Sequence, residues 1–147
     1  MITFKTGDIF TSTAKCTVNT INCVGAMGAG IALQHKKRYP EQYATYREQC
    51  FLKKIHTGNV YLWKGTDYGY DRDVLQFPTK YDWRNPSKIE YIESGLKAFV
   101  ENYEKLNITS IAFPKLGCAN GGLDWKDVKP IMVKYLQDLP ISIEIYE

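Results

Sequence analysis

Two glycine-rich stretches are the parts of this sequence best suited to binding a ligand. Each follows an apolar, β-branched run and precedes a run with helical spacing, and they read Gly25-Ala26-Met27-Gly28-Ala29-Gly30 and Gly117-Cys118-Ala119-Asn120-Gly121-Gly122. Glycine lets backbone N–H groups approach a phosphate closely, and a helix N-terminus adds a favourable dipole. One such loop is equally well explained as a tight turn. Two loops at equivalent strand ends favour a site that holds a diphosphate from both sides.

Several nucleotide and metal chemistries do not fit these residues. Neither loop matches GxxxxGK[ST], which disfavours an NTP-hydrolysing P-loop. The first loop is not the GxGxxG of a dinucleotide fold, and no acidic residue follows at the ribose position. With two histidines and no CxxC pair, the sequence matches no zinc template, so we expect no metal and no cofactor. The cysteines, which we expect as reduced thiols, are Cys16, Cys23, Cys50 and Cys118.

The composition bounds the class of protein. The 147 residues are 44% hydrophobic and 24% charged, which is typical of a globular domain, and we expect one domain over residues 1–147. A net charge of +3 is too small for a protein that grips DNA through bulk electrostatics. No apolar run is long enough to span a membrane, and the start does not resemble a signal peptide. We therefore expect a cytoplasmic protein with no membrane contact.

Strand-like and helix-like segments alternate along the chain. The expected strands span residues 2–5, 17–22, 59–63, 74–77, 108–114 and 141–146, and the expected helices span residues 31–38, 41–51, 88–106 and 125–136. Ser87 is expected to cap the third helix, with Glu90 completing a capping box. Alternation of this kind predicts an α/β fold, a three-layer α/β/α sandwich with helices on both faces of the sheet.

At the glycine loops and their flanks the sequence resembles the macrodomain family, and within it the DarG-type DNA ADP-ribosyl glycohydrolases. No single motif is specific, but the set occurs in family order over nearly the whole chain. The motifs are Gly7-Asp8-Ile9-Phe10, Val18-Asn19-Thr20-Ile21-Asn22-Cys23-Val24-Gly25, Met27-Gly28-Ala29-Gly30-Ile31-Ala32, Phe77-Pro78-Thr79-Lys80 with Trp83-Arg84, Pro114-Lys115-Leu116-Gly117-Cys118, and Asn120-Gly121-Gly122-Leu123-Asp124-Trp125.

The resemblance implies a fold and an activity. The fold would be a macrodomain sandwich with a central mixed sheet and an ADP-ribose pocket. The activity would be removal of ADP-ribose from a nucleobase, thymidine in single-stranded DNA, which reverses the action of a DarT-type toxin. A C-terminal region of the full protein, if one exists, would engage that toxin, and the chain is expected to be a monomer.

The resemblance also assigns roles to particular residues. Asp8 would accept a hydrogen bond from the adenine amino group, with Ile9 beside it, and Asn22 would lie near the distal ribose. The full set of expected ADP-ribose contacts is Asp8, Ile9, Asn22, Met27, Gly28, Gly30, Ile31, Thr79, Gly117, Cys118, Ala119, Asn120, Gly121 and Gly122. Without the resemblance, Asp8 is better explained as a turn residue and Asn22 as a strand-end residue bonded to its own backbone.

Lys80 is the catalytic residue that the resemblance implies. As an ammonium it can hydrogen-bond the departing base, and as a neutral amine it can attack the anomeric carbon. The sequence leaves both roles open. Tyr81, Trp83 and Arg84 follow directly and are candidate DNA contacts, since aromatic and guanidinium groups stack on unpaired bases and bind phosphates. The alternative for Trp83 is packing against the sheet.

Two other functions remain open at this stage. The first is a hydrolase of ADP-ribosylated protein carboxylates or of O-acetyl-ADP-ribose, and the second is a non-catalytic ADP-ribose reader. Glutamate-specific relatives pair the lysine with an aspartate in the second loop, where this chain has Gly121. The nearby Asp124 is expected to cap the following helix. This departure favours the DNA-directed activity, and Lys80 favours an enzyme over a reader.

Overall fold

A computed structural model describes all residues, 1–147, as six strands, four α-helices and two short 3-10 turns. The strands are β1 (Ile2–Lys5), β2 (Cys16–Ile21), β3 (Tyr61–Trp63), β4 (Asp73–Pro78), β5 (Ser110–Phe113) and β6 (Ser142–Tyr146). The helices are α1 (Gly30–Arg38), α2 (Pro40–Phe51), α3 (Ile89–Asn102) and α4 (Trp125–Leu136), and the 3-10 turns are η1 (Ile9–Thr11) and η2 (Gly65–Tyr68).

The strands form one mixed sheet in the order β1-β6-β5-β2-β4-β3. All neighbours are parallel except β3, which pairs antiparallel with β4 at the edge. The register places Val18 beside Leu75 and Ile111 beside Ile143. Because five strands run in the same direction, their carboxyl ends meet at one edge of the sheet. The loops that follow these strands are therefore neighbours in space.

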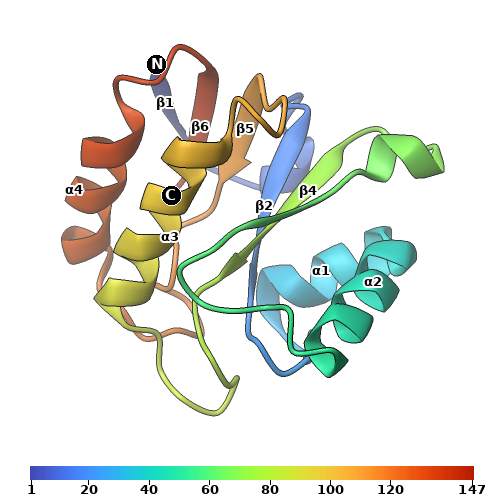
Figure 1. The fold of residues 1–147 in the computed structure, drawn as a ribbon. Coiled ribbons are helices and arrows are strands. Elements are labelled where there is room, and N and C mark those ends of the chain that lie inside the picture. The colour runs from blue at the N-terminus through green and yellow to red at the C-terminus, as the bar shows by residue number, and fades with distance from the viewer.

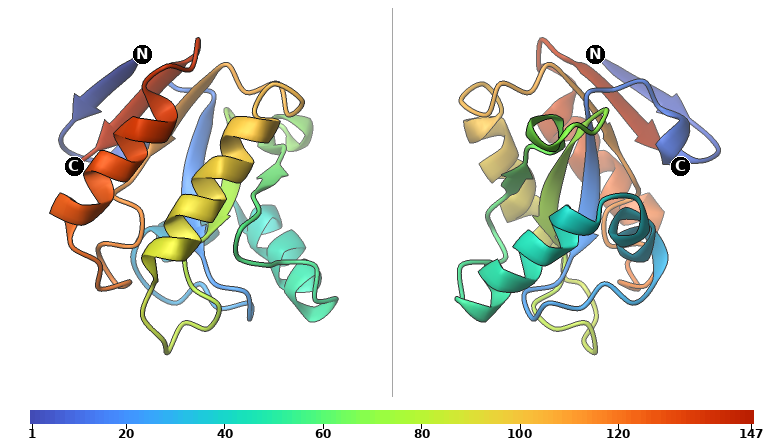
Figure 2. Two further views of the ribbon diagram at one scale, coloured as in Figure 1. Left: turned by 60° about the vertical axis from the view of Figure 1, so that its left-hand side comes forward. Right: turned by 90° about the vertical axis from the view of Figure 1, so that its right-hand side faces the viewer.

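The helices cover the two faces of the sheet. Helices α3 and α4 lie side by side on one face, and α1 and α2 lie together on the other (Figures 1 and 2). This arrangement confirms the predicted α/β fold with its mixed central sheet. No helix is long and apolar enough to cross a membrane.

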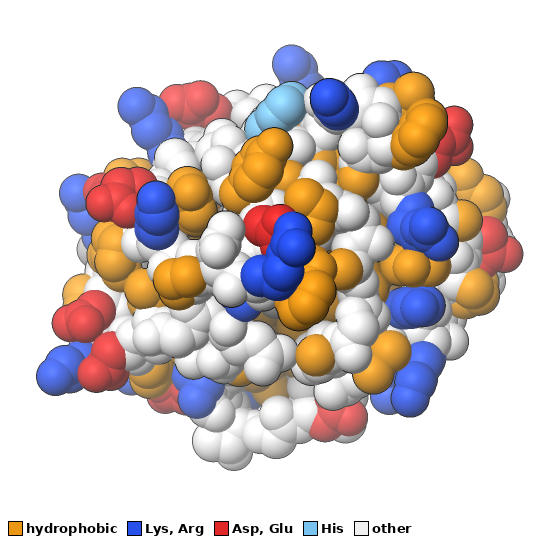
Figure 3. Space-filling view, turned by 90° about the horizontal axis from the view of Figure 1, so that it is seen from below, with side chains coloured by type: hydrophobic (Ala, Val, Ile, Leu, Met, Phe, Trp, Pro, Cys, Tyr) orange, Lys and Arg blue, Asp and Glu red, His pale blue; other side chains and the backbone are white.

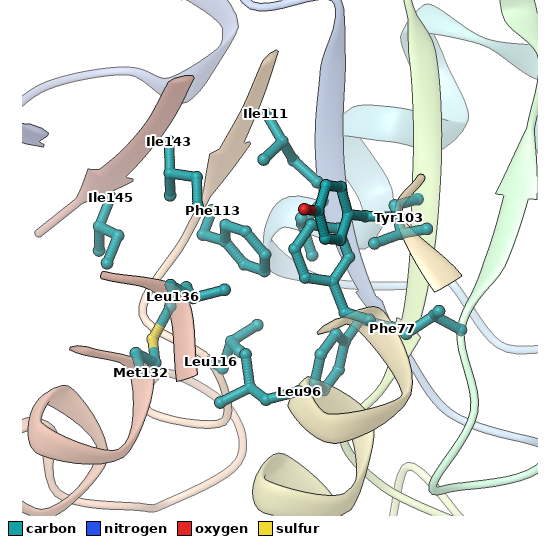
Figure 4. Close-up of a cluster of buried hydrophobic side chains, with 14 of the residues drawn as sticks. Phe77, Leu96, Tyr103, Ile111, Phe113, Leu116, Met132, Leu136, Ile143 and Ile145 are labelled. Carbon is teal, nitrogen blue, oxygen red and sulfur yellow. The ribbon is translucent and has the colours of Figure 1, made fainter. Parts of the chain in front are cut away.

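The larger hydrophobic core lies between the sheet and the α3–α4 layer (Figure 4). Phe77 of β4 and Phe113 of β5 are fully buried in it, and Phe99 of α3 packs edge-on against Phe113 with ring centroids 5.4 Å apart. A Cβ at Gly95 would lie 2.4 Å from the Phe77 ring, so α3 approaches β4 this closely only because residue 95 has no side chain. The packing fixes the position of the carboxyl end of β4.

The predicted helices and strands are largely present, with two differences around α3. The helix ends at Asn102 rather than Leu106, because the chain turns through residues 103–107 and Asn107 adopts a left-handed conformation with φ of 58°. The predicted capping box is wrong. Lys88 is the N-cap, and the Ser87 hydroxyl has no hydrogen-bond partner because it is buried beneath the second glycine loop.

Candidate functional site

A cleft of about 1100 Å³ opens at the edge where the parallel strands end. Its walls come from the loops after β1, β2, β4 and β5 and from the end of β6. Figure 3 looks onto this edge and shows basic, acidic and hydrophobic side chains gathered near the middle of the face. Ligands of open α/β sheets bind at such edges, so this cleft is the candidate site.

Asn22 shapes the first glycine loop. Its Oδ1 accepts from the backbone N–H of Val24 at 3.1 Å and of Ala26 at 3.3 Å, and its Nδ2 donates to the Ala26 carbonyl at 2.8 Å. The alternative explanation of Asn22 as a strand-end residue bonded to local backbone therefore holds. Asn22 also lines the cleft, and one hydrogen of Nδ2 has no partner within the protein. The residue both holds the loop and offers one donor.

The first loop leads into the start of α1. Gly30, the first residue of α1, has φ of 57°, a conformation that favours glycine. Ala29 is the N-cap and supplies no side-chain cap, so the first N–H groups of α1 are open to a ligand. Met27 does not line the cleft. It is 2% exposed and packs in a small core with Ile21 and Tyr46, which anchors the loop from below.

The second glycine loop follows β5 and is closely packed at two glycines. Gly117 has φ of 72°. A Cβ at Gly121 would lie 2.3 Å from the Gly117 carbonyl oxygen and 2.4 Å from Ser87 Oγ. Neither contact is possible for a real side chain, so no aspartate fits at residue 121 in this loop. Asp124 caps α4 as predicted, since its Oδ1 accepts from the Lys126 N–H at 3.1 Å.

Lys80 connects the two sides of the cleft. It follows β4, is half-buried, and its Nζ donates to the Asn120 carbonyl at 2.8 Å and to the Trp83 carbonyl at 3.3 Å. The first acceptor belongs to the second glycine loop and the second to the loop after β4. The amine is therefore held in the wall of the cleft. One further tetrahedral position on the nitrogen remains for a ligand.

Exposed aromatic rings stand beside Lys80. Tyr81 is 59% exposed and Trp83 is 56% exposed, and Trp83 lines the cleft, so packing against the sheet is not its role. Arg84 pairs with Asp82 through Nε–Oδ1 at 3.0 Å and Nη2–Oδ2 at 2.6 Å. The guanidinium holds the pKa of Asp82 at about 2, so the carboxylate stays charged. The pair fixes the backbone turn that presents Trp83.

Asp8 has two roles open to it at the β1 end of the cleft. Its Oδ1 accepts from the Phe10 N–H at 2.9 Å and caps η1, which is the turn role expected without the resemblance. The side chain is exposed and lines the cleft, so Oδ2 remains available to a donor. Ile9 beside it is 7% exposed and supplies an apolar surface to the cleft.

Most of the residues expected at the site line the cleft. These are Asp8, Ile9, Asn22, Gly28, Gly30, Ile31, Thr79, Lys80, Trp83, Gly117, Cys118, Ala119, Asn120 and Gly121. Met27, Gly122, Tyr81 and Arg84 lie outside the lining. Sequence reasoning missed Lys115, Tyr146 and Glu147, which do line it. The last two follow from topology alone, because β6 is a parallel strand whose end reaches the same edge.

The fold and the cleft together define a macrodomain. The family model described as Macro domain matches residues 18–132, and the chain belongs to this family. The macrodomain of Mycobacterium tuberculosis DarG is a solved structure that superposes with a TM-score of 0.93 at 42% identity, covering 99% of this chain and 97% of that one. The predicted resemblance to DarG-type macrodomains is therefore confirmed.

Two curated relatives are named as enzymes that act on ADP-ribosylated DNA. A protein of Mycobacterium tuberculosis named DNA ADP-ribosyl glycohydrolase is 43% identical over 140 residues, which is 95% of this chain and 40% of that protein. A protein of Thermus aquaticus with the same name is 37% identical over 148 residues, covering 100% of this chain and 41% of its own length. The chain thus spans about 40% of the length of these relatives.

Proposed function

We propose that this chain is a DNA ADP-ribosyl glycohydrolase that removes ADP-ribose from a base, thymidine in single-stranded DNA. The observation that carries the proposal is the Lys80 amine. It is held 2.8 Å from the Asn120 carbonyl of the second glycine loop, in the wall of a cleft suited to ADP-ribose. The names of the DarG relatives support the choice of DNA as the substrate. The reaction would reverse the modification made by a DarT-type toxin.

The ADP-ribose would lie along the carboxyl edge of the sheet. Asp8 accepts from the adenine amino group through its free Oδ2, with Ile9 against the ring. The uncapped N–H groups at the start of α1 and those of the second glycine loop bind the diphosphate. Asn22 donates its remaining Nδ2 hydrogen to a hydroxyl of the distal ribose, which brings the anomeric carbon toward Lys80. A solved Thermosipho africanus DarTG structure in complex with ADP-ribose, with a TM-score of 0.90, supports this choice of ligand.

Lys80 acts on the bond between ribose and base. Water replaces the base at the anomeric carbon, and the electron pair of the broken bond leaves with the base. An ammonium donates its free N–H to that base, whereas a neutral amine attacks the anomeric carbon first. Lys80→Arg separates the two roles. Arginine keeps the charge and the donors but cannot act as the nucleophile. Residual turnover in this variant supports the ammonium role, and complete loss supports nucleophilic attack.

The DNA strand would contact the exposed side chains beside Lys80. Trp83 and Tyr81 offer rings on which unpaired bases stack, and Arg84 offers a guanidinium to a phosphate. Its bidentate pairing with Asp82 leaves Nη1 free for that contact. Recognition would then centre on ADP-ribose, with a few local strand contacts. This is consistent with a net charge of only +3.

The packing at Gly121 argues against the alternative hydrolase. The aspartate that glutamate-specific relatives pair with the lysine has no room beside the Gly117 carbonyl and Ser87 Oγ. A covalent mechanism that needs a lysine and an aspartate at these positions is therefore not available to this chain. The non-catalytic reader is disfavoured because a reader needs the pocket and has no use for the amine of Lys80.

One experiment tests the proposed function. The protein is incubated with an ADP-ribosylated single-stranded oligonucleotide and, separately, with glutamate-ADP-ribosylated protein. We expect release of the label from the oligonucleotide only. Label retained on the oligonucleotide would overturn the proposal, and release from protein alone would favour the carboxylate-directed hydrolase.

The biological setting follows from the same proposal. A DarT-type toxin supplies the substrate and is a partner through any further region of the full protein. The chain is proposed to act as a monomer in the cytoplasm, where its DNA substrate lies.

A further inference from the structure

Tyr46 is a buried polar residue that the proposed reaction does not use. It lies in α2, on the face of the sheet opposite α3 and α4, and is 0% exposed. Its hydroxyl lies 2.8 Å from the Asn22 carbonyl oxygen and 2.8 Å from Asn22 Oδ1. A phenol brought into a core requires a partner, and here both partners belong to the same residue.

The Tyr46 hydroxyl is one of three groups that hold the Asn22 amide in one orientation. Oδ1 faces three donors, namely the Tyr46 hydroxyl and the N–H groups of Val24 and Ala26. The backbone N–H groups can only donate, so the amide group cannot be flipped. Nδ2 is then the atom left for the cleft, and Asn22 presents a donor rather than an acceptor to any ligand.

Helix α2 supports the first loop at a second point one turn further on. A Cβ at Gly25 would lie at contact distance from Cys50 Cβ, 3.7 Å, so the loop passes close to this residue. Tyr46 and Cys50 are four residues apart and share one face of α2. Met27 fills the small core beneath them. Of these contacts from α2 and the small core, only that of Tyr46 reaches the Asn22 amide.

We propose that Tyr46 is a positioning residue for the ADP-ribose site, which acts by orienting the Asn22 amide toward the ligand. The inference rests on the proposed function, since it requires ADP-ribose in the cleft. Without the hydroxyl, the Asn22 carbonyl loses this donor, and Oδ1 keeps only the two longer contacts. The two N–H groups still prevent the amide from flipping, but they hold it less firmly, and Nδ2 is in line with the ribose hydroxyl for part of the time only.

The test uses Tyr46→Phe, which removes one oxygen and keeps the ring. We expect the Kd for ADP-ribose to rise about five- to tenfold, the usual effect of one lost hydrogen bond. On the modified oligonucleotide, KM rises by a similar factor while kcat changes much less, because Lys80 keeps its contacts with Trp83 and Asn120. A merely structural role would not separate KM from kcat in this way. Tyr103→Phe is the matched control, since Tyr103 is 6% exposed and packs on Phe99 in the other core.

NMR of the side-chain amides gives a second measurement. In the unaltered protein, adding ADP-ribose should shift the Asn22 amide signals and the Tyr46 hydroxyl proton together, a result that does not depend on any variant folding. In Tyr46→Phe, the Asn22 signals should move before ligand is added. The proposal is overturned if Tyr46→Phe binds within twofold of the unaltered protein, or if the Asn22 signals do not move. Failure of the unaltered protein to bind ADP-ribose would instead refute the proposed function.

Discussion

Lowering the pH should destabilise this protein through a single buried histidine. His35 of α1 is 0% exposed, its Nδ1–H donates to the Ile31 carbonyl at 2.9 Å, and its Nε2 accepts from the Thr17 hydroxyl of β2 at 3.1 Å. Burial lowers the pKa of His35 from 6.5 to about 4, helped by the positive charges of Arg72 and Arg38. The folded protein therefore favours the neutral ring.

The sign and size of the effect follow from these values. A group with a lowered pKa in the folded state protonates more readily in the unfolded chain, so acid favours unfolding. The contribution of His35 is fully present above about pH 6.5 and is lost as the pH falls toward 4. Between pH 7 and pH 5 the loss is about 2 kcal/mol, or about 4–8 °C in Tm for a domain of this size.

Urea unfolding at pH 7 and at pH 5, followed by tryptophan fluorescence, measures this loss. His35→Gln removes the titrating ring, so its free energy of unfolding should change much less between the two pH values. His56→Gln is the matched control, because His56 is the only other histidine and should leave the pH dependence in place. The reasoning is refuted if His35→Gln keeps the full pH dependence, or if the unaltered protein loses less than about 0.5 kcal/mol.

Three further outcomes can be checked on single variants. Lys80→Ala should lose turnover on the modified oligonucleotide while its Kd for ADP-ribose stays within about threefold, since the groups proposed to bind ADP-ribose do not include the Lys80 amine. Calorimetry measures the Kd and label release measures turnover, and surviving turnover would show that Lys80 is not catalytic. Gly121→Ala should weaken ADP-ribose binding at least about tenfold, because its Cβ would meet the Gly117 carbonyl at 2.3 Å and displace the loop. Gly95→Ala should lower the free energy of unfolding by about 1–3 kcal/mol through overlap with Phe77, and an unchanged urea midpoint would contradict the packing described.

Local sequence patterns were sufficient to predict most of the helices and strands. The apolar spacing of residues 125–136 predicted α4 with its observed bounds, and β1 likewise matches its predicted range. A helix such as α4 is predictable because burial of one face imposes its period directly on the sequence. The cap of α3 was not predictable in this way, although its start was predicted within one residue. Ser87 has the right type and spacing for a cap, yet its hydroxyl lies under Gly121, a contact that no local pattern encodes.

The site, too, was predictable from local sequence only in part. The glycines, Asp8, Asn22 and Lys80 are recognisable in the sequence because their types and order are constrained over short stretches. Their convergence at one cleft depends on five parallel strands ending at the same edge, and that pairing joins residues as distant in the sequence as Ile2 and Ile143. The burial of Met27, the closure of residue 121 to any side chain and the Tyr46–Asn22 contact arise only when α2 and the loops pack against that edge. Local chemistry thus specified the parts of the site, whereas long-range packing set their orientation, because side-chain direction is determined by neighbours distant in the sequence.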